Sequence, residues 1–260
     1  MISTKRNERI KKIIKILDDQ GNASTIFLAK SFDVSESSIR RDINHMISSG
    51  KYGNLKRVYG GVIVEDNSEG HEYMFELKLS LNKEYKKAIA REASRFINKG
   101  DHIIIDSGTT CLYLAEMLYD KENVYVITLD IKIAEELGKH SNIESNIIGG
   151  VIRPGYYTVG GIRALENLDI FTPNKVFMSV DAIDIEHGIT NASEFEVGVK
   201  RKLLQMSDQV FIIADYTKLN TNNLYRVASI SAVKKIITNK ELDYSIAEHI
   251  RKIGIELILV

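Results

Sequence analysis

Short apolar runs and stretches of helical periodicity alternate from residue 102 to the end of this 260-residue chain. Apolar strands separated by helices are typical of βαβ units, in which helices cover both faces of a mostly parallel sheet. We therefore predict an α/β domain with a mostly parallel sheet and flanking helices. The helical stretch 82–98 precedes it. The strand-like runs are 102–106, 124–128, 142–148, 175–180, 209–214, 235–238 and 255–260, and the helical stretches between them are 109–119, 131–138, 161–168, 194–206 and 244–253.

The N-terminal part of the chain predicts a second, smaller domain. In the stretch 35–50, apolar side chains recur at helical spacing and must line one buried stripe. Ser35 is suited to cap this helix and Gly50 to end it. Two shorter helical stretches, 10–17 and 24–31, come before it, so the region predicts a helix-turn-helix. The apolar stripe consists of Ile39, Ile43, Met46 and Ile47.

A small β-wing is expected after this helix, because two β-prone runs, 55–59 and 62–64, follow a turn at Gly53-Asn54. The first 64 residues carry 12 Lys and Arg against 6 Asp and Glu, a net charge of +6 in a chain that is neutral as a whole. A basic head on an acidic body is typical of a protein that binds nucleic acid. The predicted boundaries are 1–64 for a winged helix-turn-helix domain, 65–80 for a polar linker and 81–260 for the α/β domain.

The face opposite the apolar stripe carries arginines, an asparagine and hydroxyl groups near a helix N-terminus. Such side chains are suited to contact phosphates and base edges of double-stranded DNA. A solvated charged surface is the alternative interpretation. The predicted DNA-binding residues are Ser35, Ser37, Ser38, Arg40, Arg41, Asn44, Lys56 and Arg57.

The run 35–43, with the Ile-Arg-Arg-Asp core at 39–42, is followed by Tyr-Gly-Gly at 59–61. These motifs resemble those of the DeoR-type family of bacterial sugar-operon repressors, and the resemblance covers nearly the whole chain. It implies a repressor of a sugar-catabolic operon, with a sensor domain like the ribose-5-phosphate isomerases and a phosphorylated sugar as the effector that releases DNA. Ser38 stands where the family usually has Thr, which keeps the hydroxyl group but loses a methyl group. Because one small module reads only a few base pairs, we also expect a homo-oligomer, a dimer or a tetramer.

Ligands of parallel α/β sheets bind beyond the carboxyl ends of the strands. The loop 107–110 follows a strand, contains a glycine and hydroxyl groups, and opens a helix, so it is suited to bind an anion. An ordinary capped turn is the alternative. The resemblance implies a phosphate-holding loop here and a sensor motif in the Asp-x-x-Lys run 215–218, which could equally be a surface ion pair. The predicted effector-binding residues are Asp106, Ser107, Gly108, Thr109, Thr110, Thr128, Arg153, Asp181, Glu194, Asp215 and Lys218.

Three further features near the predicted site leave alternatives open. Asp130 is expected to cap the following helix rather than to bind ligand. Leu129 stands where the family usually has Asn, which puts one polar ligand contact in doubt. The glycine pair 149–150, just before Arg153, either lets the backbone approach a ligand or forms a mere turn.

The composition argues against several other classes of protein. No run approaches the roughly 18 apolar residues of a membrane span, and the N-terminus has no signal-peptide pattern. One cysteine, Cys111, excludes an intrachain disulfide and fits the cytoplasm; we expect it to be a small buried residue. The six histidines lack metal-ligand spacing, so neither a metal nor a cofactor is expected.

The alternative function is a sugar-phosphate isomerase, in which Asp106, Asp181 or Asp184 would act as the catalytic base. A basic DNA-reading domain has no role in such an enzyme.

Overall fold

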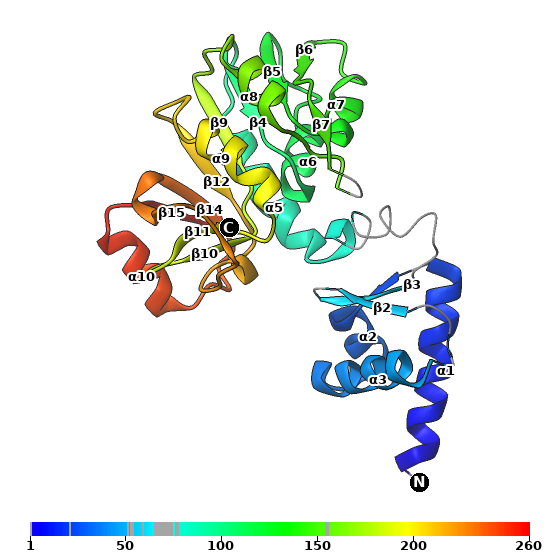
Figure 1. Cartoon of the computed structure of the whole chain (residues 1–260). Helices are drawn as coiled ribbons and strands as arrows, with labels where there is room; N and C mark the ends of the chain where they lie inside the picture. The colour runs from blue at the N-terminus through cyan, green and yellow to red at the C-terminus, as the bar shows by residue number, and fades with distance from the viewer. Residues whose placement is uncertain are drawn as a thin grey trace. The chain divides into compact units, whose positions relative to one another are not determined.

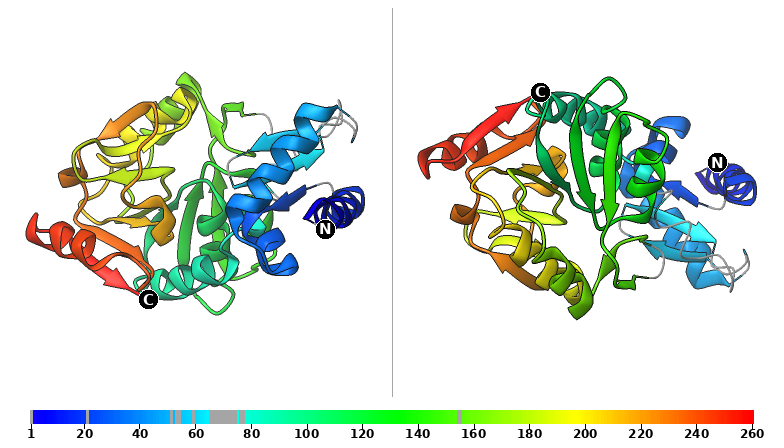
Figure 2. Two further views of the ribbon diagram at one scale, coloured as in Figure 1. Left: turned by 90° about the horizontal axis from the view of Figure 1, so that it is seen from below. Right: turned by 90° about the horizontal axis from the view of Figure 1, so that it is seen from above.

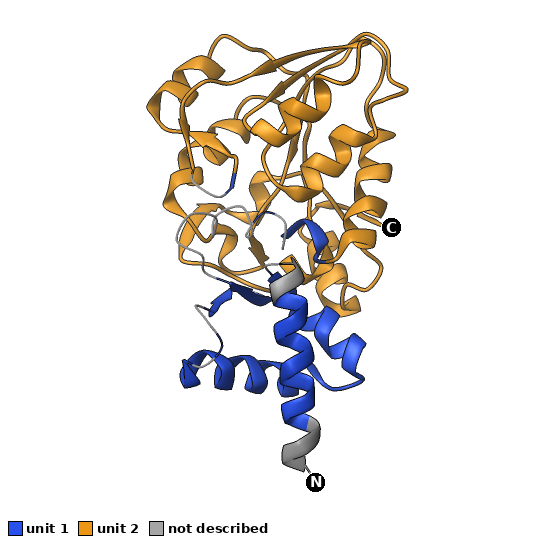
Figure 3. Cartoon of the chain, turned by 90° about the vertical axis from the view of Figure 1, so that its right-hand side faces the viewer, with its two compact units in different colours: residues 1–81, 154–156 blue, residues 82–153, 157–260 orange. Residues whose placement is uncertain are grey.

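The computed structural model describes residues 2–20, 22–50, 52, 55–58, 60–64, 75, 78–153 and 156–260. The chain forms two compact units (Figures 1 and 3), residues 1–81 with 154–156 and residues 82–153 with 157–260. Most of the predicted linker and the predicted turn at Gly53-Asn54 lie outside the described residues. None of the described helices has the length and apolar character that crossing a membrane requires.

The N-terminal unit contains the three expected helices. Ser24 caps the second helix by accepting a hydrogen bond from Phe27 N (3.0 Å), and Ser35 caps the third by accepting one from Ser38 N (3.3 Å). Gly50, with φ of +61°, ends the third helix as expected. The helices are α1 (Ile2–Gln20), α2 (Thr25–Phe32) and α3 (Glu36–Ser49).

The wing pairs β2 (Leu55–Val58) with β3 (Gly61–Val64) in antiparallel register. A third strand, β1 (Asn22–Ser24), pairs with β3 on its other side. The sequence analysis predicted no strand there, because three residues carry too little periodicity to indicate one. The core of the unit joins α1, α2, α3 and Val62 of the wing.

The C-terminal unit is built on a fully parallel seven-stranded sheet in the order β15-β14-β12-β9-β4-β5-β6, seen from two further sides in Figure 2. All seven expected strands are present, each within a few residues of its predicted bounds. They are β4 (His102–Ile105), β5 (Val124–Thr128), β6 (Ile143–Ile147), β9 (Lys175–Met178), β12 (Val210–Ile213), β14 (Lys235–Thr238) and β15 (Glu256–Leu259).

Helices follow most of these strands, as the alternation predicts. The predicted helix 194–206 is divided into a 3-10 turn, η1 (Glu194–Glu196), and a regular helix. The α-helices are α5 (Lys83–Ser94), α6 (Thr109–Glu116), α7 (Ile131–Leu137), α8 (Ile162–Leu168), α9 (Val197–Leu203) and α10 (Tyr244–Lys252).

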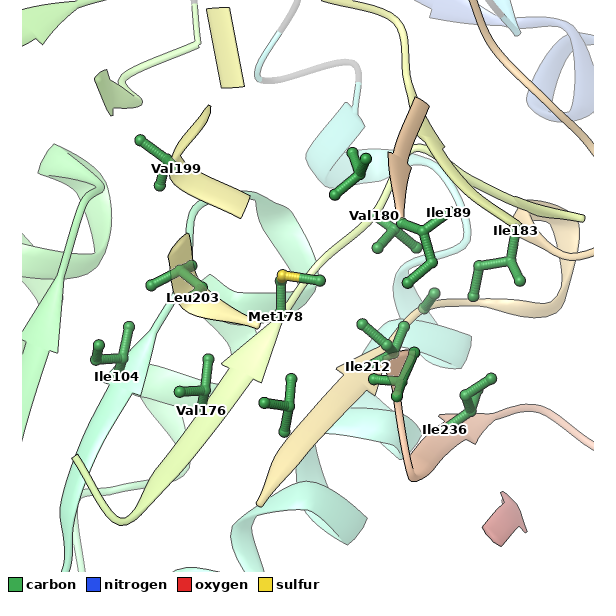
Figure 4. Packing of buried hydrophobic residues seen from close by; sticks show 14 of the residues in the cluster. Ile104, Val176, Met178, Val180, Ile183, Ile189, Val199, Leu203, Ile212 and Ile236 are labelled. Carbon is green, nitrogen blue, oxygen red and sulfur yellow. The ribbon is translucent and has the colours of Figure 1, made fainter. Parts of the chain in front are cut away.

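Alternate residues of each central strand pack on opposite faces of the sheet. On one face, Val199 and Leu203 of α9 lie over Ile104, Val176 and Met178 of the sheet (Figure 4). On the other face Phe177 stacks on Phe211, with ring centroids 4.9 Å apart, and Phe211 meets Phe96 at 5.1 Å. This double burial explains why the strands read as continuous apolar runs.

A second, antiparallel sheet was not predicted. Its strands are β10 (Ala182–Asp184), β11 (Gly188–Asn191) and β13 (Tyr225–Ala228), in the order β10-β11-β13. The short hairpin of β7 (Val151–Ile152) and β8 (Val159–Gly160) was also missed. These strands are two to four residues long, too short for period-two alternation to show. At Gly188, where φ is +78°, a Cβ would stand 2.2 Å from the backbone oxygen of Ala228, so only glycine fits.

Candidate DNA-binding face and effector site

The buried stripe of α3 orients its opposite face toward solvent. Ile39, Ile43 and Met46 are at most 1% exposed, as predicted, whereas Arg40 and Arg41 are exposed. A helix that buries one stripe in a small core presents the other as a rigid surface. The structure therefore places the predicted DNA-contacting side chains of α3 together on one outer face.

Hydroxyl groups and arginines interact at the N-terminal end of this face. Ser35 Oγ lies 2.9 Å from Ser37 Oγ and 3.0 Å from Ser38 Oγ. Arg41 donates from Nε to the backbone oxygen of Ser37 (3.3 Å) and from Nη2 to Ser38 Oγ (3.4 Å). Arg40 forms an exposed ion pair with Glu36 at 2.9 Å, an interaction of little energy.

The wing adds its two basic residues to the same unit. Arg57 Nη1 donates to Asn44 Oδ1 at 3.0 Å, which joins the wing to α3. Lys56 precedes Arg57 on β2, so its side chain points to the opposite side of the strand. Both residues are exposed. Of the two, Arg57 shares a continuous surface with α3.

Asp42 has a role that the sequence interpretation missed. Its carboxylate is 2% exposed and accepts hydrogen bonds from Arg6 Nε (2.8 Å) and Arg9 Nε (2.7 Å) of α1. Asp42 directly follows the two arginines but falls on the buried side of α3. It therefore positions the helix, and an acidic residue beside the apolar stripe was the signal that could have shown this.

The carboxyl edge of the parallel sheet holds a buried ion pair between Asp106, after β4, and Lys200 of α9. Lys200 Nζ lies 2.6 Å from Asp106 Oδ2 and 2.9 Å from the backbone oxygen of Ser179, and both charged side chains are about 1% exposed. Burial alone would lower the pKa of Lys200, but the charges of Asp106 and Glu196 raise it above its ordinary value. Lys200 therefore stays charged at the centre of this edge.

Two further charged groups surround this ion pair. Glu196 Oε2 lies 3.9 Å from Lys200 Nζ, and its other oxygen pairs with Arg153 Nη1. Asn191, which is fully buried, donates from Nδ2 to Glu196 Oε2 at 3.1 Å. In the described part of the chain its Oδ1 has no hydrogen-bond partner. A buried acceptor without a donor is unusual in native proteins.

The predicted phosphate-holding loop lies against the end of β9. Ser179 Oγ donates to the backbone oxygen of Ser107 at 2.6 Å. Gly108 has φ of +104°, and a Cβ there would stand 3.1 Å from Ser179 Oγ. Thr109 and Thr110 begin α6 and are buried. The loop is therefore held in a conformation that requires glycine.

Asp215 and Lys218 belong to a second group, after β12. Asp215 is 2% exposed, and its Oδ1 accepts hydrogen bonds from Thr217 N (3.2 Å) and Asn82 Nδ2 (3.1 Å). Lys218 lies at the end of the 3-10 turn η2 (Tyr216–Lys218) and is half-buried. Asn82, which precedes α5, was not foreseen, because 133 residues separate it from Asp215.

The remaining acidic candidates take separate positions. Asp181 accepts a hydrogen bond from Ala192 N at 3.1 Å and adds its charge to the surroundings of Lys200. Glu194 is exposed in η1. Asp184 Oδ1 accepts hydrogen bonds from the backbone N–H groups of His187 and Glu186, and these bonds lower the pKa of its carboxyl group. Asp184 therefore shapes the turn between β10 and β11.

Family models match both units. Residues 9–68 match the DeoR-like helix-turn-helix domain, and residues 81–240 match the DeoR C terminal sensor domain. The chain belongs to the DeoR family of sugar-operon transcriptional regulators. This confirms the resemblance, and it supports the regulator over the isomerase. The predicted order of domains, a small winged helix-turn-helix followed by an α/β sensor domain, is confirmed as well.

Two proteins with similar sequences agree with this assignment. A protein of Escherichia coli K12 named for transcriptional regulation of the sgc region is 39% identical, over 99% of this chain and 98% of its own. The transcriptional repressor GlcR of Bacillus subtilis 168 is 28% identical, over 98% and 96%. In a structural comparison, a solved D-ribose-5-phosphate isomerase in complex with phospho-erythronic acid aligns with 53% of this chain over 54% of its own length, with 16% sequence identity and a TM-score of 0.40.

Other expectations for this DeoR-family chain concern single residues. Cys111 is fully buried, and burial raises the pKa of its thiol well above the ordinary value, so it is the inert residue expected. The glycine pair 149–150 leads into the β7–β8 hairpin; a Cβ on Gly150 would stand 2.6 Å from the backbone oxygen of Gly160. Among the described residues, no three His, Cys, Asp or Glu side chains gather to hold a metal.

Asp130 caps α7, as expected, and also reaches the glycine loop. Its Oδ1 accepts hydrogen bonds from Lys132 N and Ile133 N, its Oδ2 accepts one from Gly108 N (3.1 Å), and its own backbone N–H donates to Thr128 Oγ1 (3.3 Å). Burial raises the pKa of this carboxyl from 3.8 to about 6, although the backbone hydrogen bonds lower it. Asp130 thus connects β5, α7 and the loop before α6.

This raised pKa predicts a pH-dependent stability. Because the folded-state pKa lies above the unfolded one, the native state binds the proton more tightly, and stability falls as pH rises from about 4 to about 6. Two pKa units correspond to about 3 kcal/mol. Asp130→Asn keeps a cap acceptor but cannot ionise, so it should lack this fall. Urea unfolding of both proteins at about pH 4 and pH 7 measures the difference. Equal pH dependence in the two proteins would refute the prediction.

Proposed function

We propose that this chain represses a sugar-catabolic operon in the cytoplasm and is released from its operator by a phosphorylated sugar. The proposal rests on the presence of two features in one chain. The first is the exposed arginine face of α3, and the second is the buried charged cluster at the carboxyl edge of the sensor-domain sheet. The first is suited to DNA and the second to a small polar ligand.

Operator binding is assigned to α3 and the wing. In helix-turn-helix proteins the second helix of the motif enters the major groove and its N-terminal residues reach the base edges. Arg40, Arg41 and Asn44 occupy that position here, and the hydroxyls of Ser35, Ser37 and Ser38 are available to phosphates. Arg57 of the wing, which shares a surface with α3, adds a phosphate contact, and Lys56 is available to a phosphate on the other side of β2.

Effector binding is assigned to the carboxyl edge of the parallel sheet. Hydroxyl groups and the N-terminus of α6 in the loop 107–110 favour the phosphate, and Lys218 adds positive charge. Asp106, Asp181, Glu194 and Asp215 offer acceptors for sugar hydroxyls, while Thr128 and Arg153 complete the predicted set. Asn191 Oδ1, which has no hydrogen-bond partner among the described residues, supports this location, since a ligand hydroxyl is a donor that would satisfy it.

A homo-oligomer, a dimer or a tetramer, is part of the proposal. One winged helix reads few base pairs, and pairing two heads on half-sites about one helical turn apart multiplies affinity and specificity. Sedimentation at concentrations at which the protein binds operator tightly should therefore show a particle larger than one chain.

The test is reciprocal binding. Operator affinity is measured with and without members of a sugar-phosphate panel, after a thermal-shift screen has selected ligands that stabilise the protein. A true effector should weaken operator binding by about 5–150-fold, and operator should weaken effector binding by the same factor. If no sugar phosphate changes operator affinity, the effector assignment is wrong while the DNA-binding assignment stands.

Removing the phosphate contacts should abolish this response. The variants are Thr109→Ala/Thr110→Ala and Lys218→Ala, which leave the N-terminal unit unchanged, so ligand-free operator binding should persist. Thr172→Ala and Lys234→Ala, exposed positions outside the proposed site, serve as controls. A normal response in the site variants would place the phosphate elsewhere.

A further inference from the structure

The strand β6 forms one edge of the seven-stranded sheet and is unusually open. Within the described part of the chain it pairs only with β5. Its residues Glu144, Ser145, Asn146 and Ile147 are all exposed. The opposite edge strand, β15, is half-buried after Glu256. An open edge strand carries unpaired N–H and C=O groups that can pair with another strand.

The pairing with β5 determines which backbone groups of β6 point outward. Ile148 N donates to Thr128 O at 2.9 Å. In a parallel pair every second residue bonds to the neighbour, so residues 144, 146 and 148 face β5. Residues 143, 145 and 147 therefore direct their backbone groups away from the sheet.

This alternation restricts how a second copy of β6 could pair with the first. In an antiparallel pair, outward residues must stand opposite outward residues. A two-fold axis through Ser145 meets this condition along the whole strand: Ile143 faces Ile147, Glu144 faces Asn146, and Ser145 faces its own copy. A centre at Glu144 would place two carboxylates opposite each other, which destabilises a sheet. A centre at Asn146 would leave Ile143 beyond the end of the partner strand.

Exposed apolar side chains lie along the same segment of the chain. Ile147 is 48% exposed, Val151 61% and Ile162 76%. Val151 Cγ2 lies 3.5 Å from the position of a Cβ on Gly161, the residue that precedes Ile162 in the chain. Grouped exposed apolar side chains mark interaction surfaces. Ile147 lies at the end of β6, and the β7–β8 hairpin that contains Val151 follows it in the chain.

We propose that a second copy of this chain docks on β6 in antiparallel register around Ser145, which joins two seven-stranded sheets into one. The inference rests on the homo-oligomer of the proposed function and names its surface. Such an interface is isologous, because the same residues contribute on both sides. Main-chain hydrogen bonds supply the pairing, and the unlike residues 144 and 146 define the register.

The experiment compares the sedimentation of the full chain with that of Ser145→Pro and Ser145→Lys. The Ser145 N–H points outward, so proline there preserves the β5–β6 ladder but blocks the pairing. Lysine places like charges across the two-fold axis. Both variants should sediment at half the wild-type mass. Glu256→Lys, on the opposite edge strand, is the control and should keep the wild-type mass.

Crosslinking gives a second readout that does not depend on disrupting the strand. Ser145→Cys should form covalent dimers with a short bis-maleimide, whereas Glu256→Cys should not; the native Cys111 is buried. Unchanged mass in both Ser145 variants together with no crosslink at position 145 would overturn the assigned surface. Operator binding and the effector response, measured separately, would remain intact in that case. A monomeric wild-type chain would overturn the inference together with the homo-oligomer.

Discussion

Lys200→Met should lower the free energy of unfolding of the sensor domain by about 3–5 kcal/mol, because it leaves the buried carboxyl group of Asp106 without its cation. Asp106 is about 1% exposed. Besides Lys200, its Oδ2 accepts a hydrogen bond from the backbone N–H of Ser179 at 3.2 Å, which the variant would keep. Urea unfolding followed by circular dichroism measures the loss.

The same helix offers a matched control. Lys202 forms an ion pair with Asp169, whose side chain is 63% exposed, so Lys202→Met should cost less than about 1 kcal/mol. The double variant Asp106→Leu/Lys200→Met should be more stable than Lys200→Met alone, since it removes both charges. If Lys200→Met and Lys202→Met have equal cost, the buried pair does not stabilise the domain.

The second large effect is expected at the DNA-binding face. Arg40→Ala and Arg41→Ala should each weaken operator binding by about 1–3 kcal/mol, or about 5–150-fold, where the arginine reads a base. Where it contacts a phosphate, binding to every sequence should weaken, and the slope of log K against log salt should decrease by about one. The fold should be unaffected, because both side chains are exposed.

Arg251→Ala is the control, since Arg251 forms the same kind of exposed intrahelical pair, with Glu248, in the sensor domain. Affinities for operator and for random DNA are measured over a range of salt concentrations. Wild-type binding by both Arg40→Ala and Arg41→Ala would remove α3 from the DNA interface.

Local patterns in the sequence were sufficient for much of the fold. The spacing of Ile39, Ile43 and Met46 determined which side of α3 is buried, because helical periodicity is a property of neighbouring residues. The alternation of apolar runs and helices likewise determined a parallel sheet. The caps at Ser35 and Asp130 were readable because a cap depends on residues within one helical turn.

The pairing of distant residues depended on the tertiary fold. The ion pair of Asp106 with Lys200 spans 94 residues, and the hydrogen bond of Asn82 to Asp215 spans 133. No periodicity in the sequence shows which strands become neighbours. The sequence therefore could not indicate that Lys200 pairs with Asp106 or that Asn82 pairs with Asp215. The antiparallel sheet of β10, β11 and β13 was missed for a related reason. Its short strands are stabilised by each other and by the main sheet rather than by their own sequence pattern.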